Sequence, residues 1–163
     1  MINLIVAIGK ENLIGNGNNL PWYYPDDLKY FKRVTKDHTV IMGENTFYSI
    51  VDRLGHPLPK RKSIVATLNK DFSYEKEGYE VEVIYDFIDW MKKHKDDSEE
   101  YFVIGGKQIY TLALEYVNKM YITHINKDYE GNVYFPKIDY SLFNKISSNV
   151  EGDLDFSVYE RKK

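Results

Sequence analysis

The chain has 163 residues, of which 43% are hydrophobic and 29% charged, an ordinary globular balance with room for one sizeable core. Its net charge of −3, with both signs spread along the chain, argues against a nucleic-acid-binding protein, which usually carries a basic patch. The absence of cysteine excludes disulfides, a thiol nucleophile and a thiolate metal site.

The first part of the chain predicts a strand, a long loop and a helix. Residues 2–8 form a continuous apolar run that ends at a glycine, which suits a strand buried on both faces. This run lacks the basic start and the length of a signal peptide or a membrane span, so we expect a cytoplasmic protein and no membrane partner. Residues 10–24 are rich in glycine and asparagine and predict a loop, and loops of this length are usually functional or disordered. Residues 25–35 predict a helix that starts at proline.

The rest of the chain alternates predicted strands and helices. The expected strands are 39–43, 63–67, 82–84, 101–104 and 119–125, the expected helices are 45–51, 86–95 and 107–115, residues 52–60 are expected as loop, and a hairpin is expected over 143–161 around Gly152-Asp153. Such alternation indicates crossovers and a mostly parallel sheet, and the consecutive strands at the end indicate an antiparallel edge. We therefore expect an α/β fold.

Asp27 stands out by its helical phase. It shares a face with three apolar residues of the predicted helix, whereas the neighbouring Asp26 lies on another side and should be nearer water. A carboxylate partly removed from water has a raised pKa and can hold a proton or orient a heterocycle through paired hydrogen bonds. The helix pattern alone is equally compatible with two aspartates that only complement the helix dipole. The apolar residues of the shared face are Leu28, Phe31 and Val34.

Glycines mark two strand-to-helix turns. Gly105 and Gly106 would let the backbone approach a ligand, and the free amides of a helix start are a natural phosphate site. Gly43 repeats the arrangement, with Asn45 and Thr46 at the following helix start. Two such turns at the carboxyl ends of strands indicate a ligand with two or more phosphates. A plain tight turn would give the same pattern, and the GxGxxG fingerprint is absent.

Other catalytic chemistries find no support in the sequence. None of the four histidines, His38, His56, His94 and His124, has metal-ligand spacing with another, so we interpret all four as structural and expect no metal site. No Gly-x-Ser-x-Gly elbow is present, which leaves hydrolase chemistry without a nucleophile.

Motifs along nearly the whole chain follow one another in the order and at nearly the spacing of a known enzyme family. They are Ile14-Gly15, Leu20-Pro21-Trp22, Pro25 to Lys32, Val40 to Ile50, Pro57 to Lys62, Val103 to Tyr110, Tyr121-x-Thr123, Glu130-Gly131 and Phe135-Pro136. In these segments the chain resembles dihydrofolate reductase. The resemblance implies one domain over residues 1–163, with three layers and helices on both faces of an eight-stranded mixed sheet. It also implies hydride transfer from NADPH to dihydrofolate, giving tetrahydrofolate, and binding of antifolate inhibitors. We expect a monomer.

The resemblance assigns roles to individual residues. Asp27 would hydrogen-bond the pterin ring and favour protonation of its imine nitrogen, and Arg61 would pair with the carboxylate of the glutamate tail. Residues 13–20 would form a mobile loop that closes over the nicotinamide. The residues that would support Asp27 are Leu20, Trp22 and Thr123, and the other substrate-binding residues would be Ile5, Ala7, Leu28, Phe31, Lys32, Ile50, Leu58, Ile104 and Tyr110. The cofactor-binding residues would be Ala7, Ile14, Gly15, Asn18, Asn19, Leu20, Gly43, Asn45, Thr46, Ser49, Thr67, Leu68, Ile104, Gly105, Gly106, Lys107, Gln108, Ile109 and Tyr110. In this family the bond between the two glycines is often cis.

Several positions depart from the family pattern, and three of them concern the cofactor phosphate and the closing loop. Glu44 and Leu68 stand where basic or polar residues normally help to hold the 2′-phosphate of NADPH, and a glutamate there would repel it. NADH therefore stays open as an alternative cofactor, and the lysines that would offset the repulsion are Lys62, Lys70 and Lys107. Asn132 replaces an acidic residue that steadies the closing loop, so we expect altered loop dynamics.

Two rival interpretations remain. Aminopyrimidine reductases of the riboflavin pathway share this fold type, but we would not expect Leu20-Pro21-Trp22 together with Asp27 in one of them. A non-catalytic binding module would have lost Asp27 or the two glycines, and all three residues are present.

Overall fold

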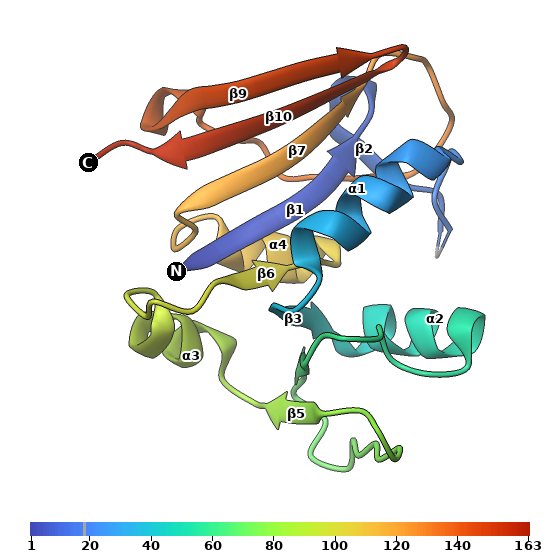
Figure 1. Cartoon of the computed structure of the whole chain (residues 1–163), viewed down its shortest axis with the longest axis vertical. Helices are drawn as coiled ribbons and strands as arrows, with labels where there is room; N and C mark the ends of the chain where they lie inside the picture. The colour runs from blue at the N-terminus through green and yellow to red at the C-terminus, as the bar shows by residue number, and fades with distance from the viewer. Residues whose placement is uncertain (18) are drawn as a thin grey trace.

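The computed structural model describes residues 1–17 and 19–163, and a central sheet organises them (Figure 1). Its strands are β1 (Ile2–Ile8), β3 (Thr39–Gly43), β4 (Ser63–Ala66), β5 (Val81–Ile84), β6 (Tyr101–Val103), β7 (Lys119–Ile125), β9 (Phe143–Glu151) and β10 (Leu154–Arg161). The order in the eight-stranded sheet is β5-β4-β3-β6-β1-β7-β10-β9. The first six of these run parallel, whereas β10 is antiparallel to both β7 and β9. The predicted fold class is confirmed.

Helices cover both faces of the sheet, and this is why β1 is apolar except for the buried Asn3. The helices are α1 (Pro25–Thr35), α2 (Glu44–Leu54), α3 (Phe87–His94) and α4 (Lys107–Ala113), with short 3-10 turns η1 (Lys10–Asn12) and η2 (Tyr140–Leu142). Leu4 and Val6 pack in one core with residues of α3 and α4. Ile5, which points to the opposite face, packs in a second core with residues of α1 and α2. A strand buried on both sides needs such a continuous apolar sequence.

The chain reverses its course across the sheet between β1 and β6. From β1 it proceeds through α1 to β3, β4 and β5, and it then returns to β6, which α4 connects to β7 on the far side of β1. Ligands of open α/β sheets bind outside the carboxyl ends of the strands at such a switch point. The first turns of α1, α2 and α4 all lie at this edge, because each helix follows a strand.

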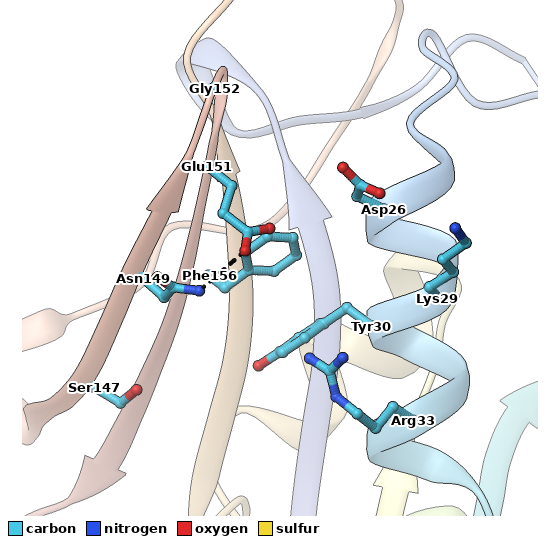
Figure 2. Close-up of a pocket in the computed structure, with 9 residues that line it drawn as sticks. All are labelled: Asp26, Lys29, Tyr30, Arg33, Ser147, Asn149, Glu151, Gly152 and Phe156. Carbon is cyan, nitrogen blue, oxygen red and sulfur yellow. Dashed lines mark hydrogen bonds between the residues drawn. The ribbon is translucent and has the colours of Figure 1, made fainter.

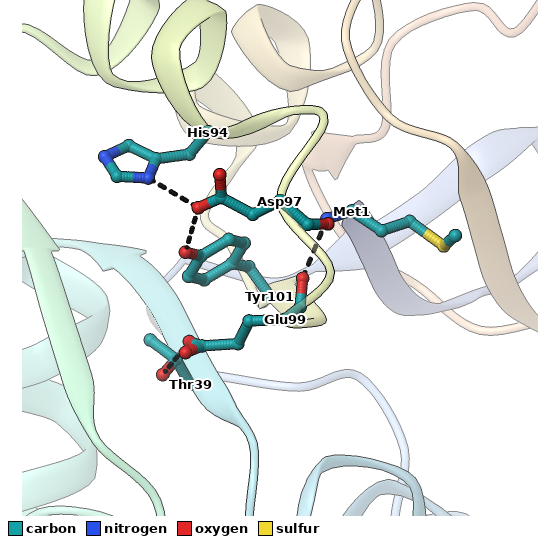
Figure 3. A network of polar contacts seen from close by, with 6 residues as sticks. All are labelled: Met1, Thr39, His94, Asp97, Glu99 and Tyr101. Carbon is teal, nitrogen blue, oxygen red and sulfur yellow. Dashed lines mark hydrogen bonds and ion pairs between the residues drawn. The ribbon is translucent and has the colours of Figure 1, made fainter.

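The opposite, amino edge of the sheet is tied together by the N-terminus (Figure 3). The Met1 ammonium donates hydrogen bonds to the carbonyl oxygens of Asp97 and Glu99 in the loop before β6. The Asp97 carboxylate accepts a hydrogen bond from the Tyr101 hydroxyl at 2.6 Å, and that of Glu99 accepts one from the Thr39 hydroxyl at 3.0 Å. These bonds join the starts of β1, β3 and β6, and so they lie far from the edge that carries the switch point.

Two predicted loops contain regular structure, so these expectations are corrected. Residues 10–24 include η1 and a strand, β2 (Leu13–Gly15), which pairs with β8 (Val133–Tyr134) in a separate two-stranded sheet. Both strands are too short to give a recognisable local pattern. Their pairing also joins residues more than a hundred positions apart in the sequence, which no local pattern contains. The predicted loop 52–60 is the second of these, because the helix predicted over 45–51 continues to Leu54. This helix ends at Gly55, whose φ of 81° is left-handed and favours glycine. No helix in the described part of the chain is long and apolar enough to cross a membrane.

Candidate active site

Asp27 lies in the first turn of α1, at the carboxyl edge of the sheet. It is half-buried, whereas Asp26 is exposed, as the helical phase predicted. Burial raises the pKa of Asp27 above its ordinary value, and a smaller opposing effect comes from hydrogen bonding by the Thr123 hydroxyl. Thr123 is buried on β7, directly opposite Ala7 on β1. Asp27, Thr123 and Ala7 therefore lie together beside the switch point.

The other side of α1 borders a separate polar cleft of about 580 Å³ (Figure 2). Asp26, Tyr30 and Arg33 line it from the helix, and Asn149 and Glu151 line it from the β9–β10 hairpin. Asp27 is not among its lining residues. The two aspartates of the first turn thus lie on different surfaces of α1, and only Asp27 belongs to the candidate site.

An apolar wall extends from Asp27 along α1. Five residues that the sequence assigned to the substrate pocket belong to one core cluster or pack against it, namely Ile5, Phe31, Ile50, Leu58 and Ile104. Leu28 differs, because 48% of it is exposed and it belongs to no core cluster. Leu28 therefore presents an apolar surface that packs into no core cluster of the described residues. Lys32 is exposed on the same helix.

Arg61 lies at the far end of this wall, beside the end of α1. Its guanidinium donates hydrogen bonds to the Pro59 carbonyl at 2.8 Å and to the Thr35 hydroxyl at 3.2 Å. Only 9% of the residue is exposed, and burial lowers the pKa of Arg61, with a smaller opposing effect from Asp37. None of the ion pairs within the described residues involves Arg61. It is thus a nearly buried cation whose fixed side chain is suited to an incoming carboxylate.

The two glycine turns lie side by side at the ends of β3 and β6. The Gly43 amide donates a hydrogen bond to the Gly105 carbonyl at 2.9 Å, and the bond between Gly105 and Gly106 is cis, as the resemblance implied. A side chain at Gly105 would lie 3.1 Å from the Tyr110 ring, and one at Gly43 would lie 3.2 Å from Ile109. Tyr110 and Ile109 therefore pack behind the glycines and support them.

The start of α2 offers unpaired backbone donors next to these glycines. Its N-cap is Gly43, and no side chain caps the helix. The first amides of an uncapped helix need an external acceptor, and an anion such as a phosphate satisfies them. Thr46 is half-buried at this turn, whereas Asn45 and Ser49 are exposed. Lys107 and Gln108 are also exposed, at the start of α4.

Tyr110 has a second role that the sequence did not show. Its hydroxyl donates a hydrogen bond to the carbonyl of Ile5 at 2.8 Å, which joins α4 to β1. Burial raises the pKa of Tyr110, and the nearby Asp27 adds to this shift. The phenol therefore stays neutral and is bonded to the middle of β1.

The loop predicted to close the site is fastened at its base. The Asn132 amide oxygen accepts a hydrogen bond from the Gly17 amide at 2.8 Å, and the Asn132 amide donates one to the Gly15 carbonyl at 3.0 Å. A neutral oxygen thus makes the contact where the family pattern has an acid. Sequence reasoning missed the need for glycine at 131, where a side chain would collide with the Gly15 carbonyl. Asn18, a predicted cofactor residue, lies outside the described residues.

The remaining residues of this loop divide between the core and the surface. Trp22 is buried and packs against Gly9, where a side chain would lie 3.1 Å from the indole. Ile14 is half-buried against the core, whereas Asn19 and Leu20 are exposed. Leu20 is 56% exposed, which leaves its apolar side chain available to a ligand.

The predicted phosphate end of the site carries little free positive charge. Lys62 lies at the amino edge of the sheet and pairs with Glu82 at 2.9 Å and Glu80 at 3.3 Å, so it cannot serve the opposite edge. Lys70 lies over the Tyr85 ring at 3.8 Å. Of the three lysines considered as compensating charges, only Lys70 and Lys107 remain. In the described part of the chain, no cluster of potential metal ligands occurs.

Comparison with known proteins gives consistent matches over the whole chain. The family model that describes dihydrofolate reductase matches residues 1–161. The dihydrofolate reductase of Bacillus subtilis (strain 168) is 40% identical over 171 residues, which cover 99% of this chain and 95% of that protein. That of Staphylococcus haemolyticus is 35% identical over 167 residues, which cover 98% and 95%. The solved structure of dihydrofolate reductase from Enterococcus faecalis complexed with NADP(H) and RAB-propyl superposes with a TM-score of 0.81 at 30% identity, covering 100% of this chain and 97% of that one.

Proposed function

The chain belongs to the dihydrofolate reductase family, and on this premise we propose that Asp27 directs the transfer of a hydride from NADPH to dihydrofolate. The reaction consumes NADPH, dihydrofolate and one proton and gives NADP⁺ and tetrahydrofolate. The half-buried Asp27 carboxyl group beside the switch point, whose pKa burial raises and the Thr123 hydroxyl lowers, is the observation that carries the proposal.

Asp27 prepares the pterin for reduction by its charge and its hydrogen bonds. Its two oxygens accept paired hydrogen bonds from the ring, and Thr123 fixes the orientation of the carboxyl group. The negative charge stabilises the protonated imine, and the protonated imine carbon accepts hydride more readily than the neutral one. Because burial raises the pKa of Asp27, the group also holds a proton at higher pH than an exposed aspartate does.

The apolar wall and Arg61 match the rest of the substrate. Asp27 and Thr35 are eight residues apart on α1, which places the two ends of the wall about 12 Å from each other. A pterin held by Asp27 would extend its aromatic linker past Phe31, and its glutamate carboxylate would reach Arg61. The side chains that line this path therefore suit a ligand that is flat and apolar in the middle and anionic at its tail.

The residues at the glycine turns fit a dinucleotide cofactor. A side chain at Gly105 would fill the space beside Tyr110, and the uncapped amides of α2 suit a phosphate. Gly43, Thr46, Gly105 and Gly106 would hold NADPH there. When bound, the cofactor supplies the hydride. The loop before Trp22 would exclude water from the nicotinamide.

Four further properties belong to the proposal. We take residues 1–163 as one catalytic domain that acts as a monomer in the cytoplasm. Diaminopyrimidine antifolates would occupy the pterin site, because their protonated ring offers the same paired donors to Asp27.

The proposal is tested by following the absorbance of NADPH in the presence of dihydrofolate. We expect oxidation that requires both compounds and that stops when an antifolate is added. An aminopyrimidine of the riboflavin pathway serves as the alternative substrate and should give no turnover. Absence of NADPH oxidation with dihydrofolate between about pH 5 and pH 8, the range in which proteins tend to be most stable, would contradict the proposal.

A further inference from the structure

Glu44 and Asn69 form a polar pair at the carboxyl edge of the sheet. Glu44 is the first residue of α2, and its carboxylate accepts a hydrogen bond from the Asn69 side-chain amide at 3.1 Å. Asn69 is itself fixed, because its backbone amide donates to the Thr67 hydroxyl and its side-chain oxygen accepts from the Asp71 amide, both at 3.0 Å. The turn after β4 therefore orients the Glu44 carboxylate.

The strand order shows which end of the cofactor meets this pair, if the proposed function holds. Along the edge the strands follow in the order β7, β1, β6, β3, β4. Asp27 and Thr123 place the reacting ring at the β7 and β1 end, so the nicotinamide must lie nearest to them. The glycine turns that suit the phosphates follow β6 and β3. The adenosine must then continue towards β4, where Thr67 and Asn69 follow the strand.

The charge at this end is the opposite of what a 2′-phosphate requires. In dinucleotide-binding folds an acidic residue accepts a hydrogen bond from the ribose 2′-hydroxyl of NADH, whereas an arginine accommodates the 2′-phosphate of NADPH. Here the oriented group is a carboxylate, and the lysine in the same turn, Lys70, lies over the Tyr85 ring. Leu68, which is 88% exposed beside them, offers no donor to a phosphate.

We propose that Glu44, held by Asn69, is a specificity-determining residue that accepts the 2′-hydroxyl of the adenosine ribose, so that NADH serves as a hydride donor alongside NADPH. The ordinary interpretation of Glu44 is that it complements the dipole of α2. That role would change helix stability on substitution but would not change the preference between the two cofactors.

The test uses two cofactor fragments that lack nicotinamide, ADP-ribose and 2′-phospho-ADP-ribose, so that binding is measured without hydride transfer. By isothermal titration, the wild-type protein should bind 2′-phospho-ADP-ribose no more tightly than ADP-ribose. The ratio to compare is the dissociation constant of ADP-ribose divided by that of 2′-phospho-ADP-ribose. In Glu44→Gln this ratio should rise by roughly tenfold, the size expected for removing one like charge close to a dianion. Glu44→Arg should raise this ratio further. The kcat/KM for NADPH divided by that for NADH should rise in the same order of variants.

A matched control and the contrary outcomes complete the test. Glu115→Gln removes an exposed carboxylate beyond the end of α4, at the amino edge, and should leave the ratio unchanged. Thermal unfolding of each variant shows whether it is folded. If both fragments bind but the ratio is the same in wild type and Glu44→Gln, the inference is overturned and the proposed function stands. If neither fragment binds, the proposed cofactor site fails and the inference fails with it.

Discussion

Asp27→Asn is expected to lower turnover of dihydrofolate at neutral pH by about a hundredfold or more, the usual contribution of a positioned group in proton transfer. Asparagine keeps the shape of the side chain and can still contact Thr123, so the substitution removes the negative charge with little change in packing. Without that charge the protonated imine loses its stabilisation, and the carbon beside it becomes a poorer hydride acceptor. The measurement is kcat by NADPH absorbance, with single-turnover hydride transfer as a second readout.

The loss should become smaller as the pH falls. Burial raises the pKa of Asp27, so the wild-type carboxyl group begins to lose its charge at a higher pH than an exposed aspartate would. Below that pKa the wild type and the variant are both neutral at this position, and substrate protonated from solution reacts in either. The rates of the two proteins should therefore converge towards acid pH.

Asp26→Asn is the matched control for this prediction, because Asp26 is an exposed aspartate in the same turn of the same helix. It should leave turnover unchanged at every pH. Wild-type turnover in Asp27→Asn at neutral pH would show that the role given to Asp27 is wrong.

Arg61→Leu is expected to raise the KM for dihydrofolate strongly while changing kcat less. Truncating one partner of a buried, hydrogen-bonded charge pair costs about 2–5 kcal/mol, which corresponds to a loss of affinity of roughly thirtyfold or more. Arg61→Lys should recover only part of it, because an ammonium cannot form the paired bonds of a guanidinium. The comparison substrate is a dihydropterin without the glutamate tail.

Structural damage is a separate consequence of this substitution, because Arg61 also bonds the Pro59 carbonyl and the Thr35 hydroxyl. Damage of that kind would weaken binding of both substrates alike. We expect a selective loss of affinity for the substrate that carries the glutamate, and an equal loss for both substrates would show that Arg61 does not bind the glutamate tail. Arg33→Gln, which changes an exposed arginine of α1, the helix that ends at Thr35, should affect neither substrate.

The sequence predicted those parts of the site that local patterns encode. Helical phase separated Asp27 from Asp26, and the apolar periodicity of α1 predicted that Phe31 would face the core. Helical phase also placed Leu28 on that face, yet it is exposed, because phase gives a direction and cannot show whether another element lies there. A surface left open in this way is what a ligand site requires.

Features that depend on distant pairing were not predictable from the sequence. The strand β2 exists only because Leu13 and Gly15 pair with residues of β8, and glycine is required at 131 only because the Gly15 carbonyl lies against it. Tyr110 also bonds the Ile5 carbonyl of β1, a contact that its assignment to the ligand sites did not reveal. In each case the contact joins segments that no sequence window contains together.

The proposed role of Asp27 is that its carboxylate holds the pterin heterocycle, and the affinity of a diaminopyrimidine antifolate tests this role most directly, because binding needs neither hydride transfer nor turnover. The dissociation constant should be measured at neutral pH for wild type, Asp27→Asn and the control Asp26→Asn. We expect Asp27→Asn to bind the inhibitor at least about tenfold more weakly, since a charge-assisted pair of hydrogen bonds is lost, while Asp26→Asn binds as wild type does. Equal affinity of Asp27→Asn and wild type would contradict this role.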